Sequence, residues 1–169
     1  MLRFLFILVF VLNFHGVYQA DPDVCDPAAD YLTLAKQDIE NKTYDSALEK
    51  LACAEQYEPS NPEIFFNRGV VYFHLKQFPE AIQDYTRAIE NSPNIEAPFY
   101  LRSLYLRGVL HRDLSDNEAA LSDLNACLEA ASQITDPDLY GGEIGLAELY
   151  IDRGGIYERL HDLEQALAD

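Results

Sequence analysis

The distribution of apolar residues from residue 28 onward follows the spacing of amphipathic helices. Large apolar side chains recur at intervals of three and four positions, and short polar segments interrupt them. That spacing places the apolar side chains on one face of a helix. Three pairs combine a capping side chain with a proline suited to the first helical position: Asp26-Pro27, Asn61-Pro62 and Asp136-Pro137. The pattern predicts an all-α chain of consecutive helix–turn–helix hairpins.

The hairpins repeat along the chain. Small and turn-forming residues recur 34 positions later, so that Ala47, Ala54 and Pro59 correspond to Ala81, Ala88 and Pro93. An arginine–glycine pair occurs three times, as Arg68-Gly69, Arg107-Gly108 and Arg153-Gly154. Glycine inside a helix costs about 1 kcal/mol relative to alanine, so its recurrence at one register indicates close packing between helices. Because one hairpin cannot bury its apolar face alone, we expect neighbouring hairpins to stack.

These residues resemble the tetratricopeptide repeat family, whose 34-residue unit carries W-x2-L-G-x2-Y, then A-x3-F, then a late proline. Residues 62–95 match best, with Phe65, Gly69, Tyr72, Ala81, Tyr85, Ala88 and Pro93 in the family's positions. Further copies cover residues 28–61 and 101–134, and an incomplete copy covers 147–169. The resemblance implies a right-handed solenoid of antiparallel hairpins with about three and a half repeats over residues 28–169.

The first twenty residues have the order of a secretory signal peptide. Arg3 precedes an unbroken apolar run from Phe4 to Leu12, and the segment becomes polar before it ends on Ala20. The run is about half of the ~20 residues that span a bilayer. We therefore expect residues 1–20 to direct export to a periplasm, an extracellular space or a secretory lumen, with an uncleaved membrane anchor as the alternative. Residues 21–27 form an acidic leader.

The charge and the motifs narrow the classes of function. The chain carries 29 acidic against 12 basic residues, a net charge of −17, which argues against binding to nucleic acids or anionic membranes. It contains no GxSxG, HExxH, GxxxxGK[ST] or CxxC motif. His74, His111 and His161 each lack a second histidine at helical spacing. We expect no enzymatic activity, no cofactor and no metal site.

Three cysteines and one asparagine are candidates for a disulfide bond, a buried thiol and a glycosylation site. Cys25 and Cys53 can form a disulfide if the chain is exported. Cys127 occupies the position of Ala54 and Ala88 and is expected to be a core thiol. Asn41-Lys42-Thr43 is an N-glycosylation sequon. Asn41 aligns with leucines in the other copies, at a position expected to be apolar and half-buried, which argues against its occupancy.

In the family that the chain resembles, the first helix of each hairpin lines a concave groove that binds peptides or partner helices. Transferred by register, the partner-binding residues would be Leu32, Lys36, Phe66, Val70, Phe73, Tyr105, Val109 and Arg112. The groove is expected to accept an apolar or aromatic segment, with Lys36 and Arg112 available to acidic flanks. Members that grip a C-terminal carboxylate use Lys and Asn where this chain has Leu32, Val70 and Val109, so a carboxylate clamp is disfavoured. Alternatively, the groove residues pack against the chain's own leader or a missing C-terminal helix.

Two functions remain at this stage. The chain is either an exported, non-catalytic protein-interaction scaffold, which we favour, or the docking part of a longer protein whose remaining portion carries an enzyme or more repeats. The sequence ends within the fourth copy, and solenoid ends need a polar cap. Self-association through that open end is therefore a third expectation.

Overall fold

The structure is a computed structural model, and it describes residues 25–26, 29–95, 97–133 and 146–160. The expected signal peptide and most of the acidic leader lie outside this part of the chain, as does the Asp136-Pro137 pair. The same holds for the second half of the fourth repeat. None of the described helices combines the length and apolar character that crossing a membrane requires.

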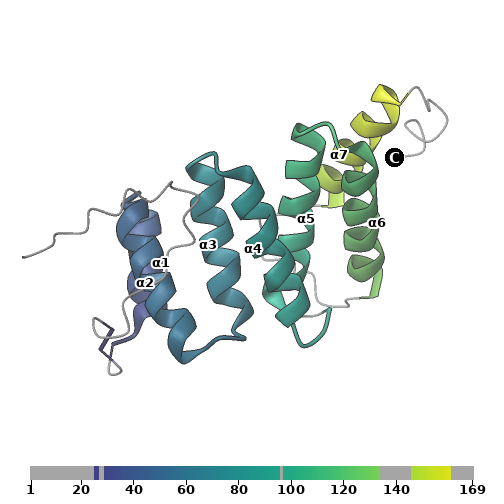
Figure 1. The fold of residues 1–169 in the computed structure, drawn as a ribbon. Coiled ribbons are helices and arrows are strands. Elements are labelled where there is room, and N and C mark those ends of the chain that lie inside the picture. Colours follow the sequence, from purple (N-terminus) through teal and green to yellow (C-terminus); the bar gives the residue numbers. More distant parts are fainter. Residues whose placement is uncertain (1–24, 27–28, 96, 134–145, 161–169) are drawn as a thin grey trace, which may run out of the picture.

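The described residues form helices and no strand, as the sequence predicts (Figure 1). The helices are α1 (Tyr31–Glu40), α2 (Tyr44–Tyr57), α3 (Pro62–His74), α4 (Phe78–Asn91), α5 (Pro98–Asp113), α6 (Asn117–Gln133) and α7 (Leu146–Arg159). Helices α1 to α6 make three hairpins, and α7 is the first helix of the fourth copy.

Side chains cap the starts of α1 and α3, whereas α2, α4 and α5 begin without a side-chain capping hydrogen bond. Asn61 accepts a hydrogen bond from the Glu63 N–H at 2.9 Å, and Pro62 is the first residue of α3. The Asp26-Pro27 pair was wrong as a helix start, because α1 begins at Tyr31. Asp30 caps that helix by accepting a hydrogen bond from the Thr33 N–H at 3.0 Å. Helix α5 begins at Pro98, three residues before the expected repeat boundary.

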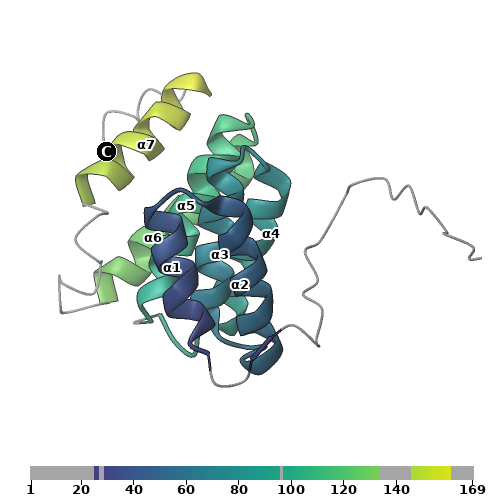
Figure 2. The same cartoon turned by 90° about the vertical axis from the view of Figure 1, so that its left-hand side faces the viewer.

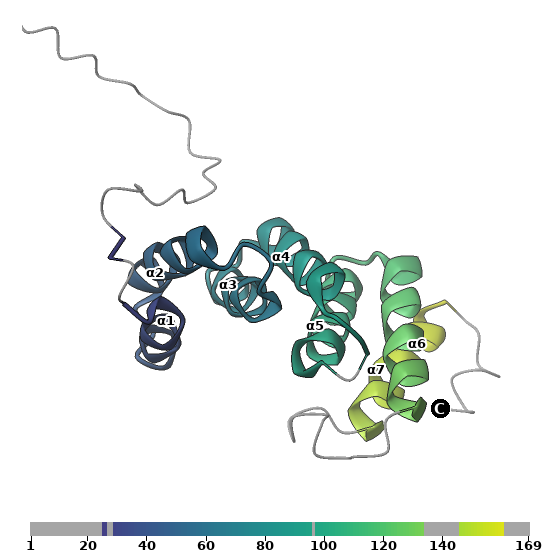
Figure 3. The same cartoon turned by 90° about the horizontal axis from the view of Figure 1, so that it is seen from below.

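The hairpins stack one after another, from α1 and α2 to α5 and α6, with α7 following (Figures 1 and 2). Each first helix contacts the next first helix, so that α1 touches α3, α3 touches α5 and α5 touches α7. Seen from below, α1, α3 and α5 lie on one side of the stack, and α2 and α4 on the other (Figure 3). The chain is an all-α solenoid, as the repeat predicts.

The core is continuous within the first two hairpins and extends into the third. Phe65 and Tyr85 are fully buried there, and Leu110 of α5 joins the same cluster. Leu101, Leu124 and Cys127 belong to a second cluster, which also includes Leu149 and Ile156 of α7. This second cluster holds α7 on the solenoid.

Candidate functional site

We define the first-helix face as the surface of the solenoid formed by α1, α3, α5 and α7. It carries all eight residues that the sequence analysis assigned to partner binding. Six of them are half-buried: the apolar Leu32, Val70, Phe73 and Val109, and the polar Tyr105 and Arg112. Leu32, Val70 and Phe73 pack against the core below them, together with Ile39. The face therefore presents an apolar surface that is supported from beneath and partly open to solvent.

Phe66 differs from these residues because it is only 4% exposed. The Phe99 ring lies 5.3 Å from the Phe66 ring and the Tyr85 ring lies 6.1 Å away, centroid to centroid. The guanidinium of Arg102 sits 4.8 Å from the centre of the Phe66 ring. Phe99 and Arg102 belong to the start of α5. That helix begins at Pro98, within residues 96–100, which form an insertion between the second and third copies. In this structure Phe66 is therefore a core residue and offers little surface to a partner.

The two basic residues of the face are already paired. The Lys36 ammonium donates a hydrogen bond to Glu63 Oε1 at 2.9 Å. The Arg112 guanidinium donates to Asp113 Oδ1 from Nε at 3.0 Å and from Nη2 at 2.8 Å, and it also pairs with Asp152 of α7. The sequence analysis treated both side chains as available to acidic flanks, and in the structure both already have carboxylate partners. Their partners are carboxylates of adjacent residues and of other helices. The alignment of the repeats does not predict these contacts.

Tyr105 also contacts α7. Its hydroxyl donates a hydrogen bond to Asp152 Oδ2 at 3.0 Å. Burial, the negative charge of Asp152 and this hydrogen bond raise the pKa of Tyr105 to about 12. Tyr105 and Arg112 thus both contact α7 through the Asp152 carboxylate. Of the eight assigned residues, the half-buried apolar ones are therefore Leu32 on α1, Val70 and Phe73 on α3, and Val109 on α5.

A buried ion-pair cluster lies between the hairpins, and the sequence analysis did not identify it. Arg68 donates to Asp84 from Nε at 2.7 Å and from Nη2 at 2.8 Å, which makes a bidentate pair. Its third nitrogen pairs with Glu55 of the preceding hairpin. Glu55 also pairs with Arg87, whose guanidinium lies 4.0 Å from the centre of the Phe65 ring. Burial alone would lower the pKa of Arg68, but Asp84 and Glu55 outweigh it and raise that pKa, so Arg68 stays charged. For Asp84, burial raises the pKa and outweighs the lowering by Arg68, so burial of this carboxylate opposes its ionisation.

The same arrangement recurs in the third copy. Arg107 donates to Asp123 from Nε at 2.8 Å and from Nη2 at 2.7 Å, and from Nη1 to Thr86 Oγ1 of the preceding hairpin at 2.8 Å. In the fourth copy, Arg153 donates to Asn125 of the preceding hairpin at 2.8 Å. The signal was present in the sequence, because an aspartate follows Arg68 and Arg107 by sixteen residues in both copies. These arginines are connectors between repeats.

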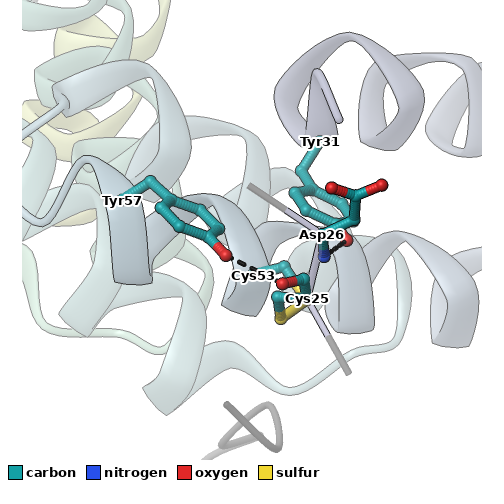
Figure 4. The surroundings of a disulfide bond; sticks show 5 residues. All are labelled: Cys25, Asp26, Tyr31, Cys53 and Tyr57. Atoms are coloured by element: carbon teal, nitrogen blue, oxygen red, sulfur yellow. Dashed lines mark hydrogen bonds between the residues drawn. A yellow bond between two sulfur atoms is a disulfide. The ribbon is translucent and has the colours of Figure 1, made fainter. Parts of the chain in front are cut away.

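The segment before α1 is fixed to the first hairpin. A disulfide joins Cys25 to Cys53 of α2, with their Cα atoms 5.6 Å apart. The Tyr57 hydroxyl donates a hydrogen bond to the Cys25 carbonyl oxygen at 2.8 Å, and the Asp26 N–H donates one to the Tyr31 hydroxyl (Figure 4). The Tyr31 and Tyr57 rings are stacked, with their centroids 6.5 Å apart. The structure thus forms the pairing that the sequence allowed.

The third cysteine is a free thiol in the core of the third hairpin. Cys127 is buried, as predicted for its position, and its thiol faces the Leu101 carbonyl oxygen at 3.7 Å. Burial and nearby Asp123 raise its pKa to about 12, so the thiol is unreactive at neutral pH. Among the residues that the structure describes, no three His, Cys, Asp or Glu side chains gather in the manner of a metal site.

The position of Asn41 corrects an expectation of the sequence analysis. Asn41, Lys42 and Thr43 are all exposed in the turn between α1 and α2. The equivalent leucines of the other copies are also exposed, with Leu75 at 36%, Leu114 at 50% and Leu160 at 48%. The expectation of a half-buried apolar position was therefore wrong, because this register faces solvent at the turn and not the neighbouring hairpin.

Comparison with known sequences supports the repeat assignment directly. Sequence models of the tetratricopeptide repeat match residues 62–95 and residues 101–134. These are the boundaries that the repeat pattern predicts for the second and third copies. Each matched segment contains one arginine–aspartate connector.

Two curated proteins resemble most of this chain but are much longer than it. Sperm-associated antigen 1 of Homo sapiens is 28% identical over 113 residues, which are 67% of this chain and 11% of that protein. The UDP-N-acetylglucosamine–peptide N-acetylglucosaminyltransferase of Giardia intestinalis is 32% identical over 114 residues, which are 68% of this chain and 7% of that protein. The chain thus spans about a tenth of these relatives' length.

Solved structures share the fold at low sequence identity. MamA is 17% identical with a TM-score of 0.66, over 82% of this chain and 71% of that chain. The first TPR of Spaghetti (RPAP3) bound to the HSP90 peptide SRMEEVD is 22% identical with a TM-score of 0.54, over 82% and 91%. With the two matched repeats and the observed hairpin stack, these findings identify the chain as a tetratricopeptide repeat protein.

Proposed function

We propose that this chain is an exported, non-catalytic scaffold that binds an apolar or aromatic segment of a partner protein on its first-helix face. The observation that carries the proposal is the half-buried apolar surface of Leu32, Val70, Phe73 and Val109, of which the first three pack on the core. Half-buried aliphatic and aromatic side chains on a rigid helical layer provide contact area at little cost in conformational entropy. An extended peptide or an amphipathic helix is the ligand that such a surface suits.

The chemistry of the face favours an apolar ligand over a free carboxylate. The structural relative named above binds an acidic HSP90 peptide. In this chain Leu32, Val70 and Val109 stand where carboxylate-gripping relatives carry Lys and Asn. Lys36 and Arg112 are held by Glu63, Asp113 and Asp152. An acidic peptide would have to compete with these carboxylates for both cations, whereas an apolar segment would not.

Selection from a peptide library tests the proposed ligand class. The chain from Asp21, immobilised in its oxidised form, is used to select from a random peptide library displayed on phage. We expect enriched peptides to share an aromatic or aliphatic core and to bind without a free C-terminus. Enrichment only of acidic peptides that end in a free carboxylate would contradict the proposal.

A matched pair of charge variants locates the binding surface. Val70→Lys and Val109→Lys together place two ammonium groups at equivalent positions of the first-helix face. Gln83→Lys and Ser122→Lys place two at equivalent, exposed positions of the second helices. Selected peptides should bind the first double variant at least tenfold more weakly than the second, by calorimetry, with both chains fully helical. Equal affinity for both variants would contradict binding on the first-helix face.

Two further features support export. The apolar run of residues 4–12 has the order of a signal peptide. The Cys25–Cys53 disulfide supports it independently, because structural disulfides persist in oxidising compartments. Fractionation of the native source with peptide mapping of the N-terminus tests this part. A mature chain that begins near Asp21 outside the cytosol is the expected result, and a cytosolic chain that retains Met1 would refute it.

A second candidate function follows from the length of the relatives. The chain matches 7% of a transferase and 11% of a second long protein, so a docking role within a longer polypeptide is the alternative. The intact mass of the protein isolated from its source separates the two. A mass near that of the mature chain supports the free scaffold, and a much larger mass supports the docking role.

A further inference from the structure

We propose that Asn41 is an N-glycosylation site on the solvent-facing turn of the first repeat. The proposal rests on the proposed export, because the modification requires passage through a compartment that contains the transferase. Asn41-Lys42-Thr43 is the single N-x-[ST] sequence with x other than proline in the chain. A single acceptor makes the occupancy of this position directly measurable.

The turn leaves room for a large polar group. All three residues of the sequon are exposed, and so are the equivalent Leu75 and Leu114 in the following copies. The position of Asn41 is exposed to solvent in all four copies, so a glycan at this position would not displace a packed side chain. The turn lies at the opposite end of α1 from the Cys25–Cys53 disulfide, so it is separate from the anchored leader.

The side chain of Asn41 has no role in holding the turn. Asparagine at a helix end is favoured where the backbone takes the left-handed conformation. In this turn Lys42 takes that conformation with φ 60°, whereas Asn41 is right-handed with φ −79° and ψ −3°. Lys76 and Ser115 take the left-handed position in the next copies. Leucine precedes them there, so the backbone does not require an asparagine.

The amide nitrogen of Asn41 is also free to react. Within the part of the chain that the structure describes, no hydrogen bond to the Asn41 side-chain amide is found, although its backbone N–H donates to Gln37. Thr43 donates its hydroxyl to the Asp38 carbonyl oxygen at 3.1 Å, which fixes the third residue of the sequon at the turn. Replacing one amide hydrogen by a sugar therefore breaks no observed contact.

The reaction is a transfer from a lipid-diphosphate-linked oligosaccharide. The amide nitrogen of Asn41 forms a bond to the anomeric carbon of the first sugar, and the bond between that carbon and the diphosphate oxygen breaks. The lipid diphosphate leaves with the electron pair, and the amide gives up one proton. No oxidant or reductant takes part. The product keeps the uncharged amide character of the side chain.

The test expresses the full chain, with its own first twenty residues, in cultured eukaryotic cells. The variants are Asn41→Gln and Thr43→Ala, which destroy the sequon, and Thr43→Ser, which preserves it and the hydroxyl donor to Asp38. Intact mass before and after enzymatic removal of N-glycans is the readout. The wild type and Thr43→Ser should each lose one glycan mass, and Asn41→Gln and Thr43→Ala should show none.

A second arm separates failure of the site from failure of export. The chain from Asp21 is carried by an unrelated cleavable signal peptide, and oxidation of Cys25 and Cys53 reports arrival in the lumen. A glycan in this arm alone supports the site and refutes export by the native leader. An oxidised chain without a glycan overturns the site proposal, as does a glycan that persists in Asn41→Gln.

Discussion

Arg68 and Asp84 form a bidentate ion pair in the interior of the solenoid, with nitrogen–oxygen distances of 2.7 and 2.8 Å. The pair joins the two helices of one hairpin, and the remaining Arg68 nitrogen reaches Glu55 of the hairpin before it. One guanidinium therefore connects three helices. Arg107 repeats this geometry with Asp123 and Thr86.

We expect Arg68→Met to destabilise the chain by about 3–5 kcal/mol, because it leaves the Asp84 carboxylate buried without its partner. Arg107→Met should cost less, since Arg107 is more exposed than Arg68 and water can reach Asp123 through the same opening. Urea unfolding followed by circular dichroism measures both. Adding Asp84→Leu to Arg68→Met should restore much of the loss, and equal small losses for both arginine variants would contradict the connector role.

Three glycine-to-alanine variants form a graded series. A Cβ on Gly69 would lie 2.7 Å from Cε1 of the buried Tyr85 ring, so Gly69→Ala should cost about 1–3 kcal/mol. On Gly108 the nearest atom would be the Asp123 Cβ at 3.2 Å, and the loss should be smaller. On Gly155 no atom lies within 4 Å, so Gly155→Ala should stabilise α7 by about 0.5–1 kcal/mol.

The melting temperature should therefore be highest for Gly155→Ala, followed by the wild type. Gly108→Ala should melt at or below the wild type, and Gly69→Ala should melt at the lowest temperature. A Gly69→Ala variant that melts with the wild type would show that the Tyr85 ring yields to the added methyl group.

Loss of the disulfide should destabilise the first hairpin by about 3 kcal/mol, since the bond closes a loop with a sequence separation of 28. The Cys25→Ser and Cys53→Ser double variant and the reduced wild type should unfold at the same urea concentration. Cys127→Ala serves as the control and should respond to reduction as the wild type does. A difference between the double variant and the reduced wild type would implicate Cys127.

Acid should weaken the link between the first two hairpins. Although burial disfavours the Glu55 carboxylate, hydrogen bonds and charge from Arg68 and Arg87 hold its pKa below the ordinary value of 4.5. A lowered folded-state pKa means that Glu55 contributes its stability above about pH 4.5 and loses it as the pH falls through the folded-state value.

Melting temperatures of the wild type and Glu55→Gln between pH 7 and pH 3 check this expectation. The wild type should be more stable at pH 7, and the difference should shrink below pH 4.5. A difference that stays constant with pH would show that the charge of Glu55 is not what stabilises the contact.

The repeat could be predicted from the sequence because each copy repeats local features. Helical spacing and the recurrence of alanine, glycine and proline gave the boundaries 62–95 and 101–134, and the family comparison matches both. The burial of Cys127 followed from the alanines at its position. These predictions require only that equivalent positions of the repeats be aligned with one another.

The details of the site depend on contacts between copies. Phe66 is covered by Phe99, which belongs to an insertion without a counterpart in the other copies. Arg112 meets Asp152 from a helix that follows in the next copy, forty residues along the chain. The position of a residue within its own repeat predicts neither of these contacts. Arg68 and Asp84 were accessible to sequence comparison, because their spacing recurs exactly, but only the structure shows that they touch.

The disulfide also determines how the molecule carries a mechanical load. The Cys25–Cys53 bond joins the leader to α2, so α1 and its turn lie inside a closed covalent loop. Tension applied to the chain ahead of Cys25 would pass into α2 at Cys53 and bypass α1. Helix α1 carries Leu32 and Lys36, so this part of the first-helix face would keep its shape while the N-terminal end of the chain is pulled.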